Sequence, residues 1–217
     1  LERQTLQPRR LIISVESRND PAFARAQAVA ASSTLPVEII IAGPATMQGQ
    51  KCRNQQAALE RIDEADDVIV LMDGDILPQQ NWLSALASPI IDDHSDVVTG
   101  HRWQQVTSHR VGAHLVTAID RGVTLLPRGT SQASVVWGGS VGISRQAAER
   151  TRLFDSLDRT LSDDLSLARH AGESGLRILT RGALLVPSPN GQRLGPAWRF
   201  ARRQYQIGHL YRPWLWW

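Results

Sequence analysis

The feature that most constrains this chain is a repeated alternation of short β-branched runs with segments of helical composition. The apolar runs at 11–15 and 37–42 are predicted strands, and they flank a predicted helix over 21–33. The alternation repeats with a helix over 51–65, a strand over 67–72, a helix over 81–91 and a strand over 96–99. This order predicts an α/β fold with a doubly wound, Rossmann-like and mostly parallel sheet flanked by helices.

The second half of the chain is less regular. It predicts a glycine-containing strand over 134–143, a helix capped by Ser144, a helix beginning at 162–164, and strands over 176–180 and 183–186. Ligands of open α/β sheets bind beyond the carboxyl ends of the strands, so we expect the functional residues in the loops that follow them.

Composition narrows the possible functions. The 217 residues are 42% hydrophobic and 21% charged, which is typical of one globular domain and excludes a disordered chain or a fibre. Cys52 is the only cysteine, which excludes a disulfide framework and favours a reducing, cytoplasmic compartment. A formal net charge of +3 is too small to indicate a nucleic-acid-binding protein.

The end of the chain is unusually aromatic. No apolar run is long enough to span a bilayer, but four of the seven tryptophans lie in the last twenty residues. We therefore expect 206–217 to be a membrane-proximal tail, and the chain to be the soluble domain of a longer membrane-associated protein. The alternative is an aromatic cluster that folds back on the core.

A first acidic pair, Asp73 and Asp75, follows the most apolar predicted strand with only Gly74 between its members. Both carboxylates therefore emerge at the carboxyl end of that strand. Such a pair suits Mg²⁺ or Mn²⁺, which takes one or two protein carboxylates and fills its other positions with water and phosphate oxygens. An ordinary acidic turn after a strand is the alternative.

A second acidic pair, Asp163 and Asp164, lies in the first turn of a predicted helix. The pair either supplies a general base or caps the helix with one carboxylate to spare. Upstream, Trp137 precedes Gly138 and Gly139, which places an aromatic wall beside a backbone without side chains. Such a backbone permits close approach of a ligand or forms a tight bulge.

Together with Gly49-Gln-Lys51-Cys-Arg-Asn54 and Thr99-Gly-His-Arg-Trp103, these motifs follow one another at characteristic spacings. Over about residues 10–217 the chain resembles a family 2 glycosyltransferase of the GT-A fold, most like the bacterial ceramide-glucosyltransferase-like members. The resemblance implies inverting transfer of a hexose from a nucleotide-sugar, usually a UDP-sugar, to an acceptor hydroxyl.

The resemblance also implies one catalytic domain over 1–217. Residues 10–100 would bind the nucleotide-sugar, 101–205 would hold the acceptor and the catalytic residues, and 206–217 would form the tail.

On the donor side, the resemblance implies that Asp75, and more loosely Asp73, hold the Mg²⁺ or Mn²⁺ ion that bridges the diphosphate. Lys51, the only lysine, would lie near the donor diphosphate or sugar. The family's usual aspartate after the first strand is replaced here, and Glu16 is the nearest acid that would contact the nucleoside.

On the acceptor side, the resemblance implies that Asp164, with Asp163 beside it, is the base that deprotonates the acceptor. Trp137, Gly138 and Gly139 would shape the acceptor or sugar pocket.

One family element departs from the usual pattern. Many members carry (Q/R)-x-x-R-W near the end, whereas the comparable stretch here reads Phe-Ala-Arg-Arg-Gln-Tyr-Gln-Ile and has no tryptophan in the expected place. Arg203 and Gln204 would contact the diphosphate or the acceptor in its stead, and the alternative is a surface helix of arginines.

Three other functions stay open. A polysaccharide-building family 2 transferase would usually display the complete Q-x-x-R-W element. A non-catalytic GT-A binding module would keep the fold without turnover, although two unpaired acidic pairs in one cleft repel each other unless a cation joins them. A haloacid-dehalogenase-type phosphatase needs a lysine between the two acidic motifs, whereas Lys51 precedes both.

The aromatic end and the arginines before it favour a lipid acceptor at a membrane surface on the cytoplasmic side.

Overall fold

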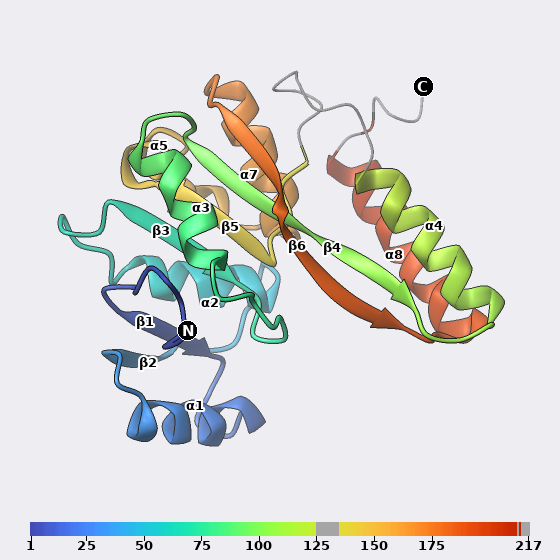
Figure 1. Ribbon diagram of the computed structural model, residues 1–217, viewed down its shortest axis with the longest axis horizontal. Helices are drawn as coiled ribbons and strands as arrows, with labels where there is room; N and C mark the ends of the chain where they lie inside the picture. The colour runs from blue at the N-terminus through green and yellow to red at the C-terminus, as the bar shows by residue number, and fades with distance from the viewer. Residues whose placement is uncertain (125–134, 212, 214–217) are drawn as a thin grey trace.

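The structure, a computed structural model, describes residues 1–124, 135–211 and 213 (Figure 1). It is an α/β fold with two sheets flanked by helices. Among the described residues, no helix is long and apolar enough to cross a bilayer. In chain order the elements are β1 (Leu11–Val15), α1 (Pro21–Ser32), β2 (Val37–Ile41), α2 (Gln50–Leu59), β3 (Val68–Met72), α3 (Trp82–Ile91), β4 (Val97–Val106), α4 (Val111–Thr124), β5 (Ser140–Ser144), α5 (Arg145–Arg150), α6 (Leu153–Ser156), α7 (Asp163–Glu173), β6 (Ile178–Asn190) and α8 (Leu194–Tyr211).

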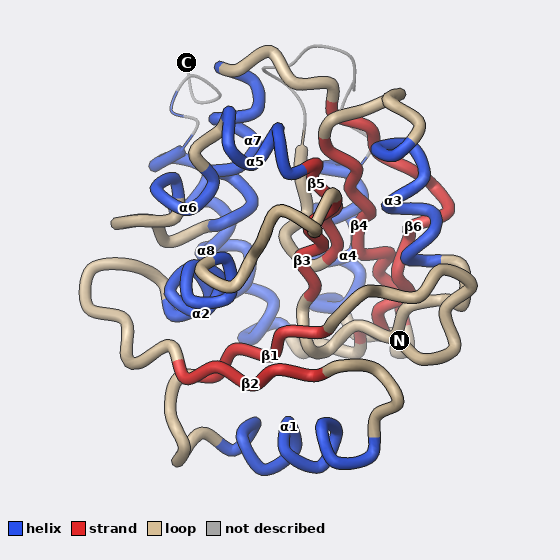
Figure 2. Tube along the Cα trace, turned by 90° about the vertical axis from the view of Figure 1, so that its left-hand side faces the viewer, coloured by secondary structure: helices blue, strands red, loops and turns tan. Residues whose placement is uncertain are grey.

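The first sheet confirms the predicted β-α-β unit. Strands β1 and β2 pair in parallel, with Leu11 opposite Val37, and α1 connects them. Asp20 begins α1, because its side chain accepts a hydrogen bond of 2.8 Å from the backbone N–H of Ala22. Helix α1 covers one face of this sheet and α2 the other (Figure 2). Helix α2 ends at Leu59, six residues before the predicted end at 65.

The second sheet corrects the prediction of a mostly parallel sheet. Its strand order is β3-β5-β4-β6, and β5 runs antiparallel to both β3 and β4, while β4 and β6 are parallel. Strand β3 pairs with β5 and not with β1, so the first hundred residues do not form one doubly wound sheet. The reason is that a continuous apolar run indicates burial on both faces of a strand but carries no information on the direction of its neighbour.

Side chains of β4 alternate between the two faces of the second sheet, as expected for a strand. Neighbouring residues Val97 and Val98 on β4 point to opposite faces of the second sheet. Helix α3 covers one face with side chains that are all buried, as predicted: Trp82, Leu83, Leu86 and Ile90. On the other face, α5 and α7 pack with residues such as Ala147 and Leu167. The predicted cap of α5 is present, because Ser144 Oγ accepts a hydrogen bond of 3.1 Å from the N–H of Ala147.

Other boundaries differ from prediction. The short strands at 176–180 and 183–186 are one strand, β6, and its partner β4 continues to Val106, so the two form a parallel ribbon that extends beyond the sheet. Helix α4 was not predicted. Strand β5 begins at Ser140, which places Trp137, Gly138 and Gly139 in a turn before it and not within a strand.

Candidate active site

Both acidic motifs meet at Lys51. Its Nζ atom lies 2.7 Å from Oδ1 of Asp73 and 3.0 Å from Oδ2 of Asp163, and it donates a hydrogen bond of 3.1 Å to the carbonyl oxygen of Gly138. These four residues, which we call the lysine cluster, come from α2, the loop after β3, the start of α7 and the turn before β5. Motifs that are far apart in the sequence therefore converge on the ammonium group of Lys51.

The glycine pair makes room for this cluster. A Cβ atom at Gly138 would lie 2.5 Å from Oδ2 of Asp163, and one at Gly139 would lie 2.4 Å from the ring of Trp137. Both distances are shorter than real Cβ contacts, so a side chain at either position would displace its neighbour. The absence of side chains here is a packing requirement of the site.

Strand β4 anchors Trp137 at the edge of the cluster. Its backbone N–H donates a hydrogen bond of 3.0 Å to Oγ1 of Thr99, and its ring centroid lies 6.1 Å from that of His101. The indole thus lies against Gly139.

One ammonium faces two carboxyl groups in the lysine cluster. Burial alone lowers the pKa of Lys51, but the carboxylates of Asp163 and Asp73 outweigh it and leave the pKa raised, so the side chain stays an ammonium. Gln55 Nε2 donates a further hydrogen bond of 2.8 Å to Oδ2 of Asp163. One positive charge therefore holds two carboxylates in fixed positions.

Asp164 has a different environment from its neighbour Asp163. Its Oδ1 atom accepts a hydrogen bond from the Ser162 hydroxyl and one of 2.8 Å from the N–H of Leu165. Ser162 is the N-cap residue of α7, but its side chain makes no capping hydrogen bond to the helix backbone and instead orients Asp164. Burial and the charge of Asp163 raise the pKa of Asp164. A carboxylate with a raised pKa is a better proton acceptor at neutral pH than an ordinary one.

Asp75 lies outside the cluster. It is exposed in the turn after β3, and in the parts of the chain that the structure describes its carboxylate makes no recorded hydrogen bond or ion pair. Within those parts, no group of three or more histidine, cysteine or acidic residues is placed to hold a metal ion. A Mg²⁺ or Mn²⁺ ion held here would take two protein carboxylates at most, from Asp75 and from Asp73, whose Oδ1 is already paired with Lys51, and would need water and a diphosphate for its other ligands.

A cavity of about 490 Å³ opens between β1 and β3 and reaches Lys51 and Asp73. Its polar lining includes Ser14 on β1 and Asn54 and Gln55 on α2. The Ser14 hydroxyl and Oε1 of Gln55 are buried and have no hydrogen-bond partner among the described residues. The volume lies within the usual range for small-molecule sites.

Sequence reasoning did not single out Ser14, Asn54 or Gln55. The available signals were weak: a serine within the apolar run of β1, and a row of amide side chains that follows Lys51 on α2.

Tyr211 ties the end of α8 to the loop that presents the second acidic pair. Its hydroxyl oxygen accepts hydrogen bonds of 2.8 Å and 3.2 Å from the backbone N–H groups of Leu161 and Ser162. From the other side, the N–H of Gly49 donates a hydrogen bond of 2.8 Å to the carbonyl oxygen of Thr160. The loop is thus held between the start of α2 and the end of α8, a role that no sequence motif indicates.

The remaining predicted residues lie elsewhere. Glu16 lies in the loop after β1 and does not line the cavity. Arg203 and Gln204 are exposed on α8, and no recorded hydrogen bond or ion pair of the described chain joins them to the lysine cluster. Helix α8 continues to Tyr211, and residues 212 and 214–217 of the predicted tail lie outside the described residues.

Comparison with known protein families finds no match to this chain. Comparison with curated proteins likewise finds no significantly similar sequence.

Proposed function

We propose that this protein is an inverting glycosyltransferase that moves a hexose from a nucleotide-sugar of the UDP-sugar class to an acceptor hydroxyl. The observation that carries the proposal is that Lys51 joins one member of each acidic pair, Asp73 and Asp163, to the glycine turn, beside a cavity between β1 and β3. Donor and acceptor groups both need to be held at one point for such a transfer.

On the donor side, the nucleotide-sugar would occupy the cavity with its diphosphate toward Lys51 and Asp73. Asp73 and Asp75 would hold Mg²⁺ or Mn²⁺, which offsets the negative charge that develops on the leaving nucleotide. Lys51 would add a positive charge beside the diphosphate, and the buried polar atoms of Ser14 and Gln55 would gain hydrogen-bond partners from the donor.

On the acceptor side, Asp164 would take the proton from the attacking hydroxyl. Its oriented carboxylate and raised pKa support this role. Trp137 would form the wall against which the sugar or acceptor lies. We further propose that the acceptor is a lipid. Glycosylation of a soluble sugar or protein, with no glycosylated lipid in an organic extract, would contradict this assignment.

The test is thermal stabilisation of the chain by UDP, GDP, dTDP and their sugars, with and without Mn²⁺. A ligand at about one hundred times its dissociation constant stabilises the native state by about 2.7 kcal/mol. We expect one nucleotide to raise the melting temperature only when the metal is present, and Asp75→Ala to remove that metal dependence. If none of the nucleotides shifts the melting temperature in the presence of Mn²⁺, the donor assignment is wrong.

A second candidate function is a binding module of the same fold without turnover. Lys51 favours it, because its ammonium lies between Asp73 and Asp163 and weakens the repulsion that a bound cation would otherwise offset. Nucleotide binding does not separate the two functions, whereas formation of a glycosylated lipid does. A phosphatase would instead hydrolyse a simple phosphate ester, so an assay with such an ester tests that alternative.

A further inference from the structure

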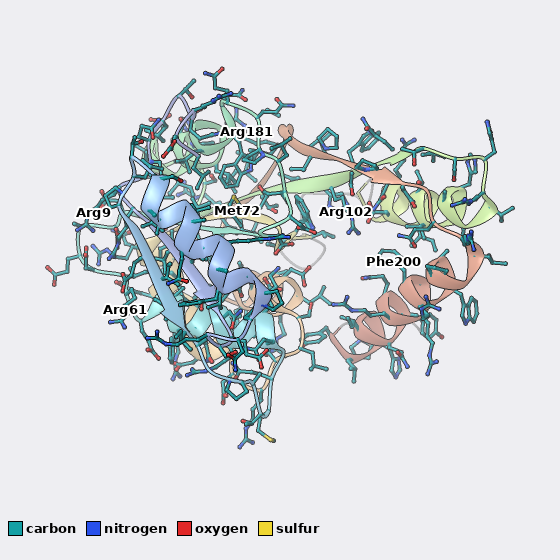
Figure 3. All side chains as sticks on the ribbon, turned by 90° about the horizontal axis from the view of Figure 1, so that it is seen from below. Arg9, Arg61, Met72, Arg102, Arg181 and Phe200 are labelled. Carbon is teal, nitrogen blue, oxygen red and sulfur yellow. The ribbon has the colours of Figure 1, made fainter. Side chains whose placement is uncertain are left out.

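Helices α4 and α8 lie side by side at the end of the β4–β6 ribbon, away from the two sheets (Figure 1). We call this pair the α4–α8 arm. Its seating on the ribbon is specific, because buried Asn190 donates hydrogen bonds of 3.1 Å to the carbonyl oxygen of Ala113 and 3.3 Å to Oγ1 of Thr117. The guanidinium carbon of Arg102 also lies 5.5 Å from the ring centroid of Phe200 (Figure 3).

One side of α8 carries exposed apolar side chains. Leu194, Trp198 and Tyr205 lie on one side of α8, because they are spaced by four and seven residues, and all three are exposed. Trp198 is 66% exposed, although burial of a large aromatic ring is strongly favourable. At the start of α4, Val111 is 71% exposed, close to the start of α8, since a Cβ at Gly112 would lie 2.8 Å from the backbone nitrogen of Leu194.

Positive charge is also concentrated on the arm, whose one acidic residue, Asp120 of α4, is buried and paired with Arg102. The segments 106–119 and 191–211 contain no aspartate or glutamate. Their exposed arginines are Arg110, Arg193, Arg199, Arg202 and Arg203. A helix with arginines beside exposed tryptophan, tyrosine and leucine has the composition of helices that lie in the plane of a membrane interface.

We propose that the α4–α8 arm docks on an anionic lipid bilayer. Aliphatic and aromatic side chains would enter the boundary between headgroups and acyl chains, while the arginines would meet the lipid phosphates. A nucleic acid would use the arginines and the aromatic rings but would leave Leu194 and Val111 exposed, so the bilayer accounts for more of the surface. An acidic protein is less suited for the same reason.

This inference goes beyond the proposed sugar transfer and does not depend on it. It does place the chemistry close to lipid: the far end of α8 carries Tyr211, which contacts the loop that presents Asp163 and Asp164. A docked arm would therefore bring the acidic pair near the membrane surface.

The experiment is flotation of the chain with vesicles of phosphatidylcholine alone or mixed with phosphatidylglycerol, at low and high salt. We expect binding only to the mixed vesicles, weakened by salt. Removing two arginines in Arg199→Gln/Arg202→Gln should lower the partition coefficient about thirtyfold. Trp198→Ser/Tyr205→Ser should lower it about tenfold or more.

Matched controls are Arg3→Gln/Arg25→Gln for charge and Ile91→Ser for an exposed apolar residue away from the arm, and both should bind as the unaltered chain does. A second readout uses Leu194→Cys labelled with a fluorophore that brightens in apolar surroundings, because native Cys52 is fully buried and burial raises the pKa of its thiol to about 12. Vesicles should brighten this label but not one at Met47→Cys.

Three results would overturn the proposal. The first is no flotation with mixed vesicles at low salt. The second is equal loss of binding in the control variants. The third is binding to soluble heparin or single-stranded DNA that is as tight as binding to mixed vesicles and is unaffected by Trp198→Ser/Tyr205→Ser, which would identify a polyanion as the partner.

Discussion

The lysine cluster and the α4–α8 arm differ in where their charged groups find partners. In the cluster, one ammonium lies within 3.0 Å of two carboxylates from different elements, and glycines allow the backbone to approach them. In the arm, exposed arginines and exposed apolar side chains lie on helices whose one acid, Asp120, is buried and paired with Arg102. Charges paired within a fold hold groups at fixed positions, whereas exposed charges without nearby counterparts are suited to a partner outside the molecule. The first region is thus organised for chemistry and the second for docking.

The largest effect should come from the carboxylate that lies beside the cluster but is not bound by Lys51. Asp164→Asn keeps an oxygen for the hydrogen bonds from Ser162 and Leu165 but cannot accept the acceptor's proton. We expect the turnover number to fall by about 10² to 10⁴-fold with donor affinity unchanged, measured by product formation and by nucleotide binding. Exposed Asp158→Asn is the control. Loss of donor binding together with turnover would show that the role assigned to Asp164 is wrong.

The packing of the cluster can be broken by one methyl group. Gly138→Ala would place its Cβ against Asp163 and Lys51, so we expect a loss of about 1–3 kcal/mol in the free energy of unfolding. Gly182→Ala is the matched control, since a Cβ there meets no atom within 4 Å. Denaturant titration of both variants measures the difference. Equal stability of the two would mean that the turn accommodates a side chain.

The raised pKa of Asp164 predicts a smaller, pH-dependent effect on stability. Because the folded-state pKa lies above the unfolded-state value, the ionised carboxylate costs stability, and this cost appears as pH rises from the unfolded-state pKa through the folded-state pKa. Asp164→Asn removes this cost. The melting temperature of the variant minus that of the unaltered chain should therefore increase as pH rises through this range and stay constant above it. A difference that stays constant from acid to neutral pH would contradict the shift.

The smallest effect concerns the contact that joins the two regions. Tyr211→Phe removes the oxygen that accepts two backbone hydrogen bonds before α7, which should cost about 0.5–1.5 kcal/mol. If the contact positions the acidic pair, the turnover number should also fall severalfold while donor affinity stays the same. Unchanged turnover in Tyr211→Phe would show that the contact stabilises the fold but does not position the acidic pair.

Prediction from sequence succeeded where the signal is local. The strand-helix-strand order to residue 42, the buried side of α3 and the cap of α5 follow from periodicity and from side chains that bond the nearby backbone. It failed where the outcome depends on partners distant in the chain. The direction of β5, the single long strand β6 and the ribbon it forms with β4 depend on pairing across many residues.

The same division holds within the candidate site. The sequence by itself determined which chemical groups are present: two acidic pairs, one lysine, a glycine pair after a tryptophan, and a C-terminal region rich in arginine and aromatic residues. Only the tertiary structure decided that Lys51 joins Asp73 to Asp163, that Tyr211 holds the loop before α7, and that α8 exposes an apolar stripe. Ion pairs and packing are set by distances in space, and a one-dimensional pattern specifies such distances only within a helix turn or a strand repeat.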